Sequence, residues 1–161
     1  AEYGLVLAAG SPDEEGIGNE VAALIAELQS TRSNVWWIKE MLPHDQLTAM
    51  LTAADLFICP SIYEPLGIVN LEAMGCETAV LGSRVGGIPE VVSDKETGEL
   101  VDYNGEAAPF EKALTESITR LMSQPELLKK YGTAGRVRAQ KLFGWDAVAA
   151  LTVDLYRKVI G

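Results

Sequence analysis

Short apolar runs closed by turn residues alternate with longer amphipathic stretches along the first half of the chain. The apolar runs are residues 3–9, 35–38, 55–60 and 78–83. Between them, residues 18–30 and 44–54 repeat apolar side chains at helical spacing. Short buried runs that alternate with amphipathic helices are typical of parallel strands covered on both faces. The pattern therefore predicts an α/β fold built on a doubly wound parallel sheet.

The last third of the chain has a different pattern. A loop rich in Gly, Asn and Pro at residues 98–109 follows or includes a last short strand. Helical stretches with an apolar face then occupy residues 110–124, 125–143 and 145–160. We expect extra C-terminal helices that pack onto the domain or onto something outside this sequence.

Length and charge exclude several classes of protein. A chain of 161 residues suits one domain with its own core, and a net charge of −10 argues against binding nucleic acid through clustered cations. The longest apolar runs fall short of the roughly 20 residues that span a bilayer, and the first residues lack the basic segment of a signal peptide. We expect no membrane contact and a cytoplasmic location.

The cysteines and the histidine form no metal-binding pattern. Cys59 and Cys76 lie in apolar settings without a CxxC pair, which favours two buried reduced thiols. His44 is the only histidine and follows Pro43 at an expected helix start. We predict no metal site and a surface position for His44.

Residues 55–72 contain the strongest candidate for a binding site. A strand ends near Pro60, a loop follows, and a helix begins near Gly67. In an open parallel sheet, ligands bind beyond the carboxyl ends of the strands, where loops lead into helix N-termini. The backbone amides of Leu66, Gly67 and Ile68 would point out of this helix start, where partial positive charge favours phosphate. The segment therefore predicts an anion site.

A pair of carboxylates flanks this helix start. Glu72 lies about one and a half turns into the helix, roughly 7 Å from the first amides, which is close to the step from a diphosphate to the ribose of a nucleotide. Glu64 precedes the helix, where a sugar attached to the phosphate would lie. An acidic residue near a helix start also complements the helix dipole, and a lone Glu on a helix is usually solvated. Both interpretations stay open from spacing alone.

The longer stretch at residues 60–92, PSIYEPLGIVNLEAMGCETAVLGSRVGGIPEVV, carries a family resemblance. Glu64 and Glu72 in an E-x7-E pair, the Pro-Leu-Gly core and the GGIPEVV segment occur in order, and DKETGELV follows. The chain resembles the C-terminal domain of retaining GT-B glycosyltransferases, and most closely bacterial glycogen synthases of the actinobacterial kind. The resemblance covers nearly the whole chain. It implies that residues 1–161 form a single Rossmann-like nucleotide-sugar-binding domain.

The resemblance implies a role for each matched residue of the helix start. Glu64, the candidate catalytic residue, would hydrogen-bond the hydroxyls of the donor sugar. Glu72 would bind the ribose diol, and the amides of Leu66, Gly67 and Ile68 would contact the diphosphate.

The segment WWIKEMLP at residues 36–43 resembles the place where the nucleotide base is lodged. The candidates there are backbone groups of Ile38 and Lys39, together with Leu42. The resemblance implies a substrate, ADP-glucose or UDP-glucose, and no separate cofactor.

By this resemblance, the chain is the donor-binding half of a retaining glucosyltransferase. The acceptor would be an α-1,4-glucan or glucose 1-phosphate, held by an N-terminal domain that this sequence lacks. The Arg/Lys segment that neutralises the departing diphosphate in the family is also absent, so this chain alone is expected to be inactive. Residues 145–160 would cross toward the absent domain, and the uncovered apolar surface predicts weak self-association.

Other functions stay open. One is another retaining hexosyltransferase of the same family, such as a mannosyl- or sucrose-related enzyme. Another is a non-catalytic module that binds a nucleotide or nucleotide sugar. A third is a structural interaction domain, which the apolar faces of the C-terminal helices favour.

Several residues near the candidate site have alternative interpretations. Arg84 would either reach phosphate or stay a solvated loop cation. Gly86 and Gly87 would either form the tight turn before a helix begun by Pro89 or line the sugar pocket. The cations of the penultimate helix would form a solvated face. They are Lys129, Lys130, Arg136, Arg138 and Lys141.

Overall fold

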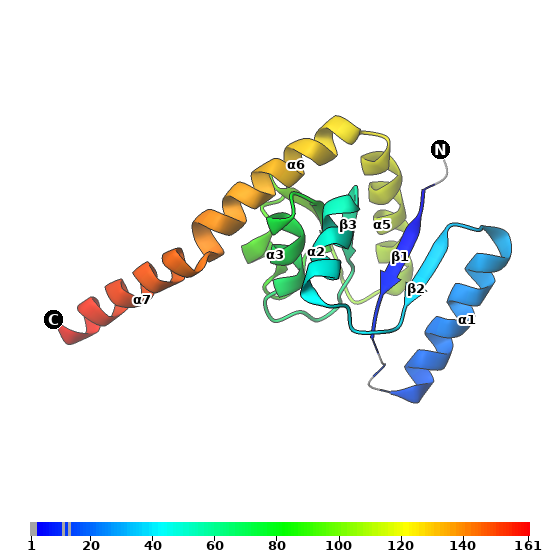
Figure 1. Cartoon of the computed structure of the whole chain (residues 1–161), viewed down its shortest axis with the longest axis horizontal. Helices are drawn as coiled ribbons and strands as arrows, with labels where there is room; N and C mark the ends of the chain where they lie inside the picture. Colours follow the sequence, from blue (N-terminus) through cyan, green and yellow to red (C-terminus); the bar gives the residue numbers. More distant parts are fainter. Residues whose placement is uncertain (1–2, 11, 13) are drawn as a thin grey trace. The chain divides into compact units, whose positions relative to one another are not determined.

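The computed structural model describes residues 3–10, 12 and 14–161. The chain divides into two compact units, residues 1–47 and 48–161 (Figure 1). The prediction of an α/β fold with parallel strands is confirmed. A single domain over residues 1–161 stays a prediction.

The N-terminal unit is a β-α-β element. Strand β1 (Leu5–Ala8), helix α1 (Glu15–Thr31) and strand β2 (Val35–Ile38) follow each other, and β1 pairs in parallel with β2 from Leu5↔Val35 to Ala8↔Ile38. Figure 1 shows α1 beside β2, which it contacts. The apolar runs at residues 3–9 and 35–38 are therefore strands, as their pattern predicts. Helix α1 begins earlier than the predicted residue 18.

Strands and helices continue to alternate through the middle of the chain. Helix α2 (His44–Ala53) leads to strand β3 (Leu56–Cys59), which is followed by helix α3 (Ile68–Gly75) and strand β4 (Ala79–Ser83). A short helix α4 (Ile88–Val91) precedes strand β5 (Gly98–Val101). These strands form a parallel sheet in the order β3-β4-β5. The expected last short strand is β5.

Helices make up the rest of the C-terminal unit. They are α5 (Ala107–Met122), α6 (Pro125–Arg138), the π-helical segment η1 (Ala139–Phe143) and α7 (Trp145–Ile160). The predicted helical stretch at 125–143 is thus divided between α6 and a π-helical segment. Gly144, in an extended conformation with φ −65° and ψ 151°, separates η1 from α7. Helix α7 buries none of its residues.

The core of the C-terminal unit lies where α5 and α6 cover strands β4 and β5. Its members are Ala79, Leu81, Val101, Phe110, Leu121, Leu128 and Tyr131. Leu81 and Leu121 are fully buried, and the rings of Phe110 and Tyr103 meet edge to face with centroids 5.3 Å apart. Strand β4 is buried along its whole length, as a central parallel strand must be. No helix among the described residues is long and apolar enough to cross a bilayer.

A buried carboxylate ties strand β5 to the helices that cover it. Glu99 accepts hydrogen bonds from the guanidinium of Arg120, at 3.0 Å from Nη1, and from the hydroxyl of Tyr131 at 3.3 Å. The ammonium of Lys95 lies 2.8 Å from its other oxygen. Burial alone would raise the pKa of Glu99, but the hydrogen bonds from Arg120 and Lys95 outweigh burial and hold the pKa below its ordinary value.

Glu99→Gln is expected to lower the free energy of unfolding by about 1–3 kcal/mol at pH 7, because an amide cannot balance two cations. Glu99 has a lowered pKa in the folded state, so its contribution is present above the unfolded pKa and is lost as pH falls through the folded one. Urea unfolding at pH 7 and below pH 4 should therefore show the deficit shrinking with acid. Asp154→Asn, which breaks an exposed pair with Arg157, is the control and should cost less than about 1 kcal/mol.

Candidate functional site

The start of helix α3 is shaped by a left-handed residue. Gly67 precedes α3 with φ 88° and ψ 50°, and its carbonyl accepts a hydrogen bond from the backbone N–H of Asn70 at 2.9 Å. A Cβ added to Gly67 would lie 2.5 Å from Nδ2 of Asn70, so a side chain is excluded by space as well as by φ. The predicted helix start near Gly67 is therefore confirmed, and Gly67 itself is buried.

Glu64 folds back onto this helix start. Its Oε1 accepts the Gly67 amide at 3.0 Å, and its backbone carbonyl accepts the Gly87 amide, also at 3.0 Å. The carboxylate thus caps the helix, which is the dipole interpretation of an acidic residue here. Within the described part of the chain, the amides of Leu66 and Ile68 have no acceptor. The helix start keeps unused donors beside the capped one.

Gly86 and Gly87 lie against the backbone of Glu64 and Pro65. Gly86 has φ 51°, and a Cβ there would lie 1.9 Å from the Glu64 carbonyl oxygen. A Cβ on Gly87 would lie 2.4 Å from the Pro65 carbonyl oxygen. Gly87 also precedes α4, with Pro89 in the first turn. The two glycines therefore make the turn before α4 and let it approach the Glu64 backbone.

Glu72 lies in the second turn of α3, on the flank of the face that buries Asn70, Ala73 and Met74. Its side chain is half-buried. Among the residues that the structure describes, its carboxylate makes no hydrogen bond or ion pair. A half-buried carboxylate without a partner is available to a ligand, and its predicted contact with ribose stays a prediction.

The predicted base segment belongs to the N-terminal unit. The Ile38 carbonyl accepts the Ala9 amide at 3.1 Å, which extends the pairing of β1 with β2. The ammonium of Lys39 lies 4.2 Å from the centre of the Trp37 ring, a cation–π contact. Leu42 is half-buried. One lone pair of the Ile38 carbonyl is thus engaged, and the roles of Ile38, Lys39 and Leu42 stay predictions.

Arg84 is held by two carboxylates. Its guanidinium donates to Asp94 and to Asp102, each at 2.7 Å. These hydrogen bonds raise the pKa of Arg84. Burial alone would raise the pKa of Asp94, but the hydrogen bonds it accepts, above all from Arg84, outweigh burial and lower the pKa. The side chain joins the loop after β4 to those around β5. Arg84 is an exposed loop cation, as one of the two alternatives predicts, and it is also ion-paired; contact with phosphate stays a prediction.

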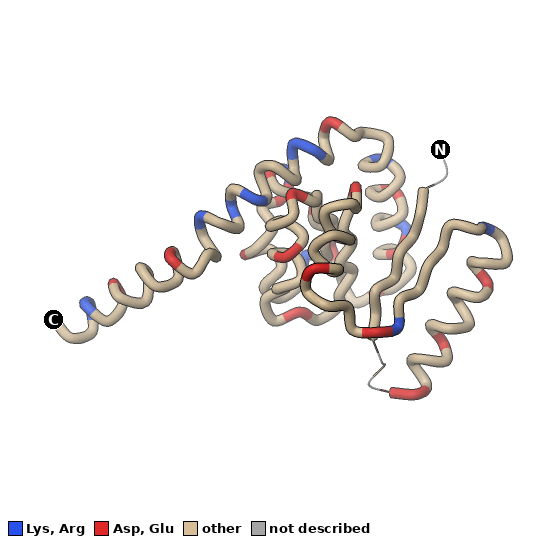
Figure 2. Tube along the Cα trace, in the orientation of Figure 1, with Lys and Arg blue, Asp and Glu red and all other residues tan. Residues whose placement is uncertain are grey.

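Some of the cations on α6 are structural as well. Arg138 donates to the backbone carbonyls of Val91 and Glu90, each at 2.8 Å, and Arg136 donates to the Gly75 carbonyl at 3.3 Å. Figure 2 shows these basic positions along α6 and η1. The remaining cations, Lys129, Lys130 and Lys141, are exposed, which agrees with a solvated face.

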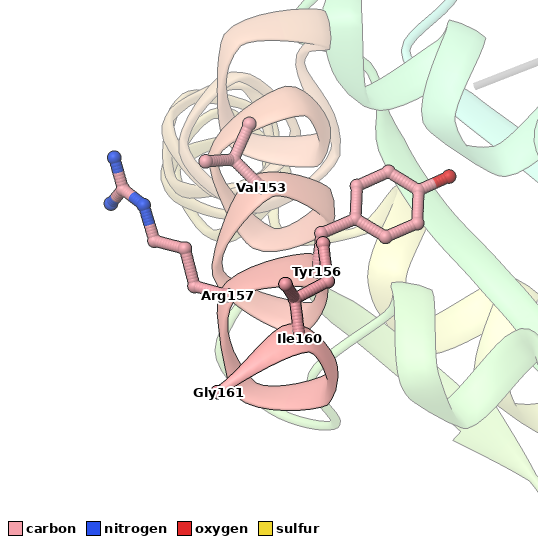
Figure 3. A pocket seen from close by; sticks show the side chains of 5 residues that line it. All are labelled: Val153, Tyr156, Arg157, Ile160 and Gly161. Carbon is pink, nitrogen blue, oxygen red and sulfur yellow. The ribbon is translucent and has the colours of Figure 1, made fainter.

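The C-terminal unit also carries an open apolar hollow on α7. It is lined by Val153, Tyr156, Arg157, Ile160 and Gly161 (Figure 3). All of these side chains come from one helix, so nothing encloses a ligand there. Within the described ranges, no group of His, Cys, Asp and Glu could hold a metal ion.

Comparison with known proteins defines the family. Residues 5–138 match the family described as Glycosyl transferases group 1. The alpha-maltose-1-phosphate synthase of Mycolicibacterium smegmatis is 48% identical over 156 residues, 96% of this chain and 40% of that protein. The MMP alpha-(1->4)-mannosyltransferase of Mycolicibacterium hassiacum is 38% identical over 138 residues, 85% of this chain and 32% of that protein.

The fold has a solved counterpart at appreciable identity. The sucrose-phosphate synthase of Thermosynechococcus elongatus superposes with a TM-score of 0.80 and 32% identity, over 97% of this chain and 38% of that one. The chain belongs to the group 1 glycosyl transferases. Within this family, it corresponds to the C-terminal domain of the GT-B architecture. The chain spans 40% of the maltose-phosphate synthase it matches, and the predicted likeness to glycogen synthase is supported only at the level of the family.

Two buried polar residues, Glu99 and Asn70, could have been considered from the sequence. Glu99 binds Lys95, four positions away, but its other partners, Arg120 and Tyr131, lie 21 and 32 positions away, and no local pattern indicates them. Asn70 is polar, yet it is fully buried in α3 among sequence neighbours that are apolar. Its spacing of three and four residues from Ala73 and Met74 places it on the buried face, and that signal was available.

Proposed function

We propose that this chain is the donor-binding part of a retaining glucosyltransferase that uses ADP-glucose or UDP-glucose. The observation that carries the proposal is the start of α3, where the Leu66 and Ile68 amides have no acceptor within the described residues, the Glu64 carboxylate binds the Gly67 amide, and Glu72 lies in the second turn. Backbone amides at a helix start suit a diphosphate. Carboxylates accept hydrogen bonds from sugar hydroxyls.

The proposed division of labour follows from these positions. The amides of residues 66–68 hold the diphosphate, and Glu72 accepts both hydroxyls of the ribose. Glu64 accepts hydroxyls of the glucose and fixes the anomeric carbon relative to the diphosphate. Ile38, Lys39 and Leu42 are the proposed contacts of the base. The reaction breaks the bond from the anomeric carbon to the diphosphate and forms one to an acceptor hydroxyl with retained configuration.

For the acceptor, we favour glucose 1-phosphate over an α-1,4-glucan. The support is the name of the relative that is 48% identical, alpha-maltose-1-phosphate synthase, since one glucosyl transfer onto glucose 1-phosphate yields a maltose phosphate. The acceptor would bind to a domain beyond these residues. A hexosyltransferase with another donor is the alternative, supported by the mannosyltransferase that is 38% identical.

Turnover is proposed to need groups outside this sequence. A departing diphosphate needs positive charge, and Arg84 already binds Asp94 and Asp102. The isolated chain is therefore expected to bind a donor without transferring its sugar. A non-catalytic nucleotide-sugar-binding module would show the same binding; a longer form of the protein that transfers glucose would exclude that alternative.

Glu64→Ala is expected to weaken binding of ADP-glucose and UDP-glucose about tenfold, because hydrogen bonds to the glucose hydroxyls are lost. Binding of ADP and UDP should not weaken, since these ligands carry no glucose. Calorimetric titration of each nucleotide into the native chain and the variant measures the difference. Glu64→Gln, which keeps an acceptor oxygen and the side-chain length, should lose less. An equal loss for all four ligands would contradict the assigned role of Glu64.

A further inference from the structure

Asn70 is a buried amide without a partner. Its side chain is fully buried, and among the described residues neither Nδ2 nor Oδ1 has a hydrogen-bond partner. An unpaired polar group in the interior costs about 1–3 kcal/mol relative to a paired one. Packing alone would favour an apolar residue of the same size, such as leucine. The free-energy cost of leaving this side-chain amide unpaired suggests that it makes a hydrogen bond in another state of the protein.

The side chain of Asn70 is directed toward the Glu64 turn. Nδ2 lies 2.5 Å from the point that a Cβ on Gly67 would occupy, and Cγ of Glu64 lies 3.5 Å from the same point. Ile88, fully buried, closes the remaining side with Cγ1 at 3.4 Å from it. Asn70 and Glu64 therefore share the space beside Gly67. The Glu64 carboxylate is a charged acceptor carried by a side chain in that space.

Under the proposed function, two acceptors compete for the backbone amide of Gly67. In this structure it donates to Oε1 of Glu64 at 3.0 Å. The same amide is one of those expected to hold the donor diphosphate, and one N–H cannot serve both acceptors well. A phosphate that takes the amide must displace a carboxylate whose charge repels it. The displaced carboxylate then needs a new donor.

We propose that Asn70 is a positioning residue whose side-chain amide receives the Glu64 carboxylate when a donor diphosphate takes the Gly67 amide. This inference rests on the proposed function and deepens it. In the free state, the Glu64 carboxylate caps the start of helix α3, and the side chain of Asn70 has no hydrogen-bond partner among the described residues. In the donor-bound state Nδ2 of Asn70 holds one oxygen of Glu64, which leaves the other to accept a glucose hydroxyl. The exchange gives an acceptor to the Gly67 amide and to Nδ2 of Asn70, and a donor to the displaced Glu64 carboxylate.

The test compares Asn70→Leu with the native chain, using whichever of ADP-glucose and UDP-glucose the native chain binds. Asn70→Leu should weaken binding about tenfold or more, because a charge-assisted hydrogen bond to Glu64 is lost. It should also leave the melting temperature unchanged or raised, since two unpaired polar atoms leave the interior. Asn70→Asp, with the same shape, is a second variant and should weaken binding by repelling Glu64.

A double-mutant cycle separates positioning from a merely structural role. In a Glu64→Ala background, Asn70→Leu should change donor affinity less than twofold, because the carboxylate that it holds is gone. In a Glu72→Ala background, which serves as the control, Asn70→Leu should keep its tenfold effect. An equal loss in both backgrounds, or no loss in the native background, would overturn the role of Asn70 and leave the proposed function standing. Failure of the native chain to bind any of the nucleotides would overturn both.

Discussion

Glu72→Ala is expected to weaken binding of ADP, UDP and their glucose conjugates alike, by about ten- to a hundredfold. A hydrogen bond from a hydroxyl to a carboxylate is worth about 1.5–3 kcal/mol, so the net loss of about one such bond to the ribose gives a change of this size. The expectation rests on the position of Glu72, half-buried on the flank of α3 with no partner for its carboxylate among the described residues. All four ligands carry the ribose, so all four should lose affinity. Calorimetry at fixed salt measures the four dissociation constants.

Glu111→Ala is the control for this substitution. Glu111 is an exposed carboxylate on α5, so its loss changes the net charge by the same amount without touching α3. The control should keep native affinity, which excludes a general effect of charge on anionic ligands. If Glu72→Ala bound every nucleotide as the native chain does, Glu72 would be an ordinary half-buried helix residue and the ribose site would lie elsewhere.

Gly86→Ala is expected to lower the free energy of unfolding by about 2–5 kcal/mol, because the added Cβ clashes with backbone and the residue has a left-handed φ. The added Cβ would lie 1.9 Å from the Glu64 carbonyl oxygen, so the backbone of one segment must move. That movement would also break the hydrogen bond from the Gly87 amide to the same oxygen. Denaturant unfolding gives the stability, and nucleotide titration of the folded variant should show weakened donor binding.

Gly105→Ala separates the clash from backbone strain. Gly105 has φ 88°, yet a Cβ there would meet nothing within 4 Å. Its replacement should therefore cost only the strain of a left-handed conformation, about 1–2 kcal/mol, and leave donor binding unchanged. If Gly86→Ala proved as mild as Gly105→Ala, the loop around residue 86 would be able to move aside, and the rigid support inferred for Glu64 would be wrong.

Local patterns were sufficient to predict the elements that carry the site. The run VWWI is strand β2 at Val35–Ile38, and the helix expected near Gly67 begins at Ile68. Both depend on apolar spacing and on turn residues, which act within a few positions. The π-helical segment η1 was missed because the apolar pattern of residues 125–143 continues through it.

Contacts between distant parts of the chain could not be predicted. Arg84 is paired with Asp94 and Asp102, ten and eighteen positions away, and no local pattern indicates these ion pairs. The Glu64 carboxylate accepts the Gly67 amide in this structure, a contact that spacing did not indicate, and its predicted contact with the donor sugar stays a prediction. Spacing along a sequence gives the distance between two residues on one helix. A carboxylate in a turn can accept a hydrogen bond from any of several nearby donors, so spacing does not predict which one it binds.

The most direct test of the donor site is calorimetric titration of ADP-glucose and UDP-glucose into the native chain. The account predicts saturable binding with one site per chain for at least one of them. It also predicts that Glu72→Ala weakens this binding at least tenfold. Failure of both nucleotide sugars to bind at millimolar concentration, or equal binding by the native chain and Glu72→Ala, would contradict a donor site at the start of α3.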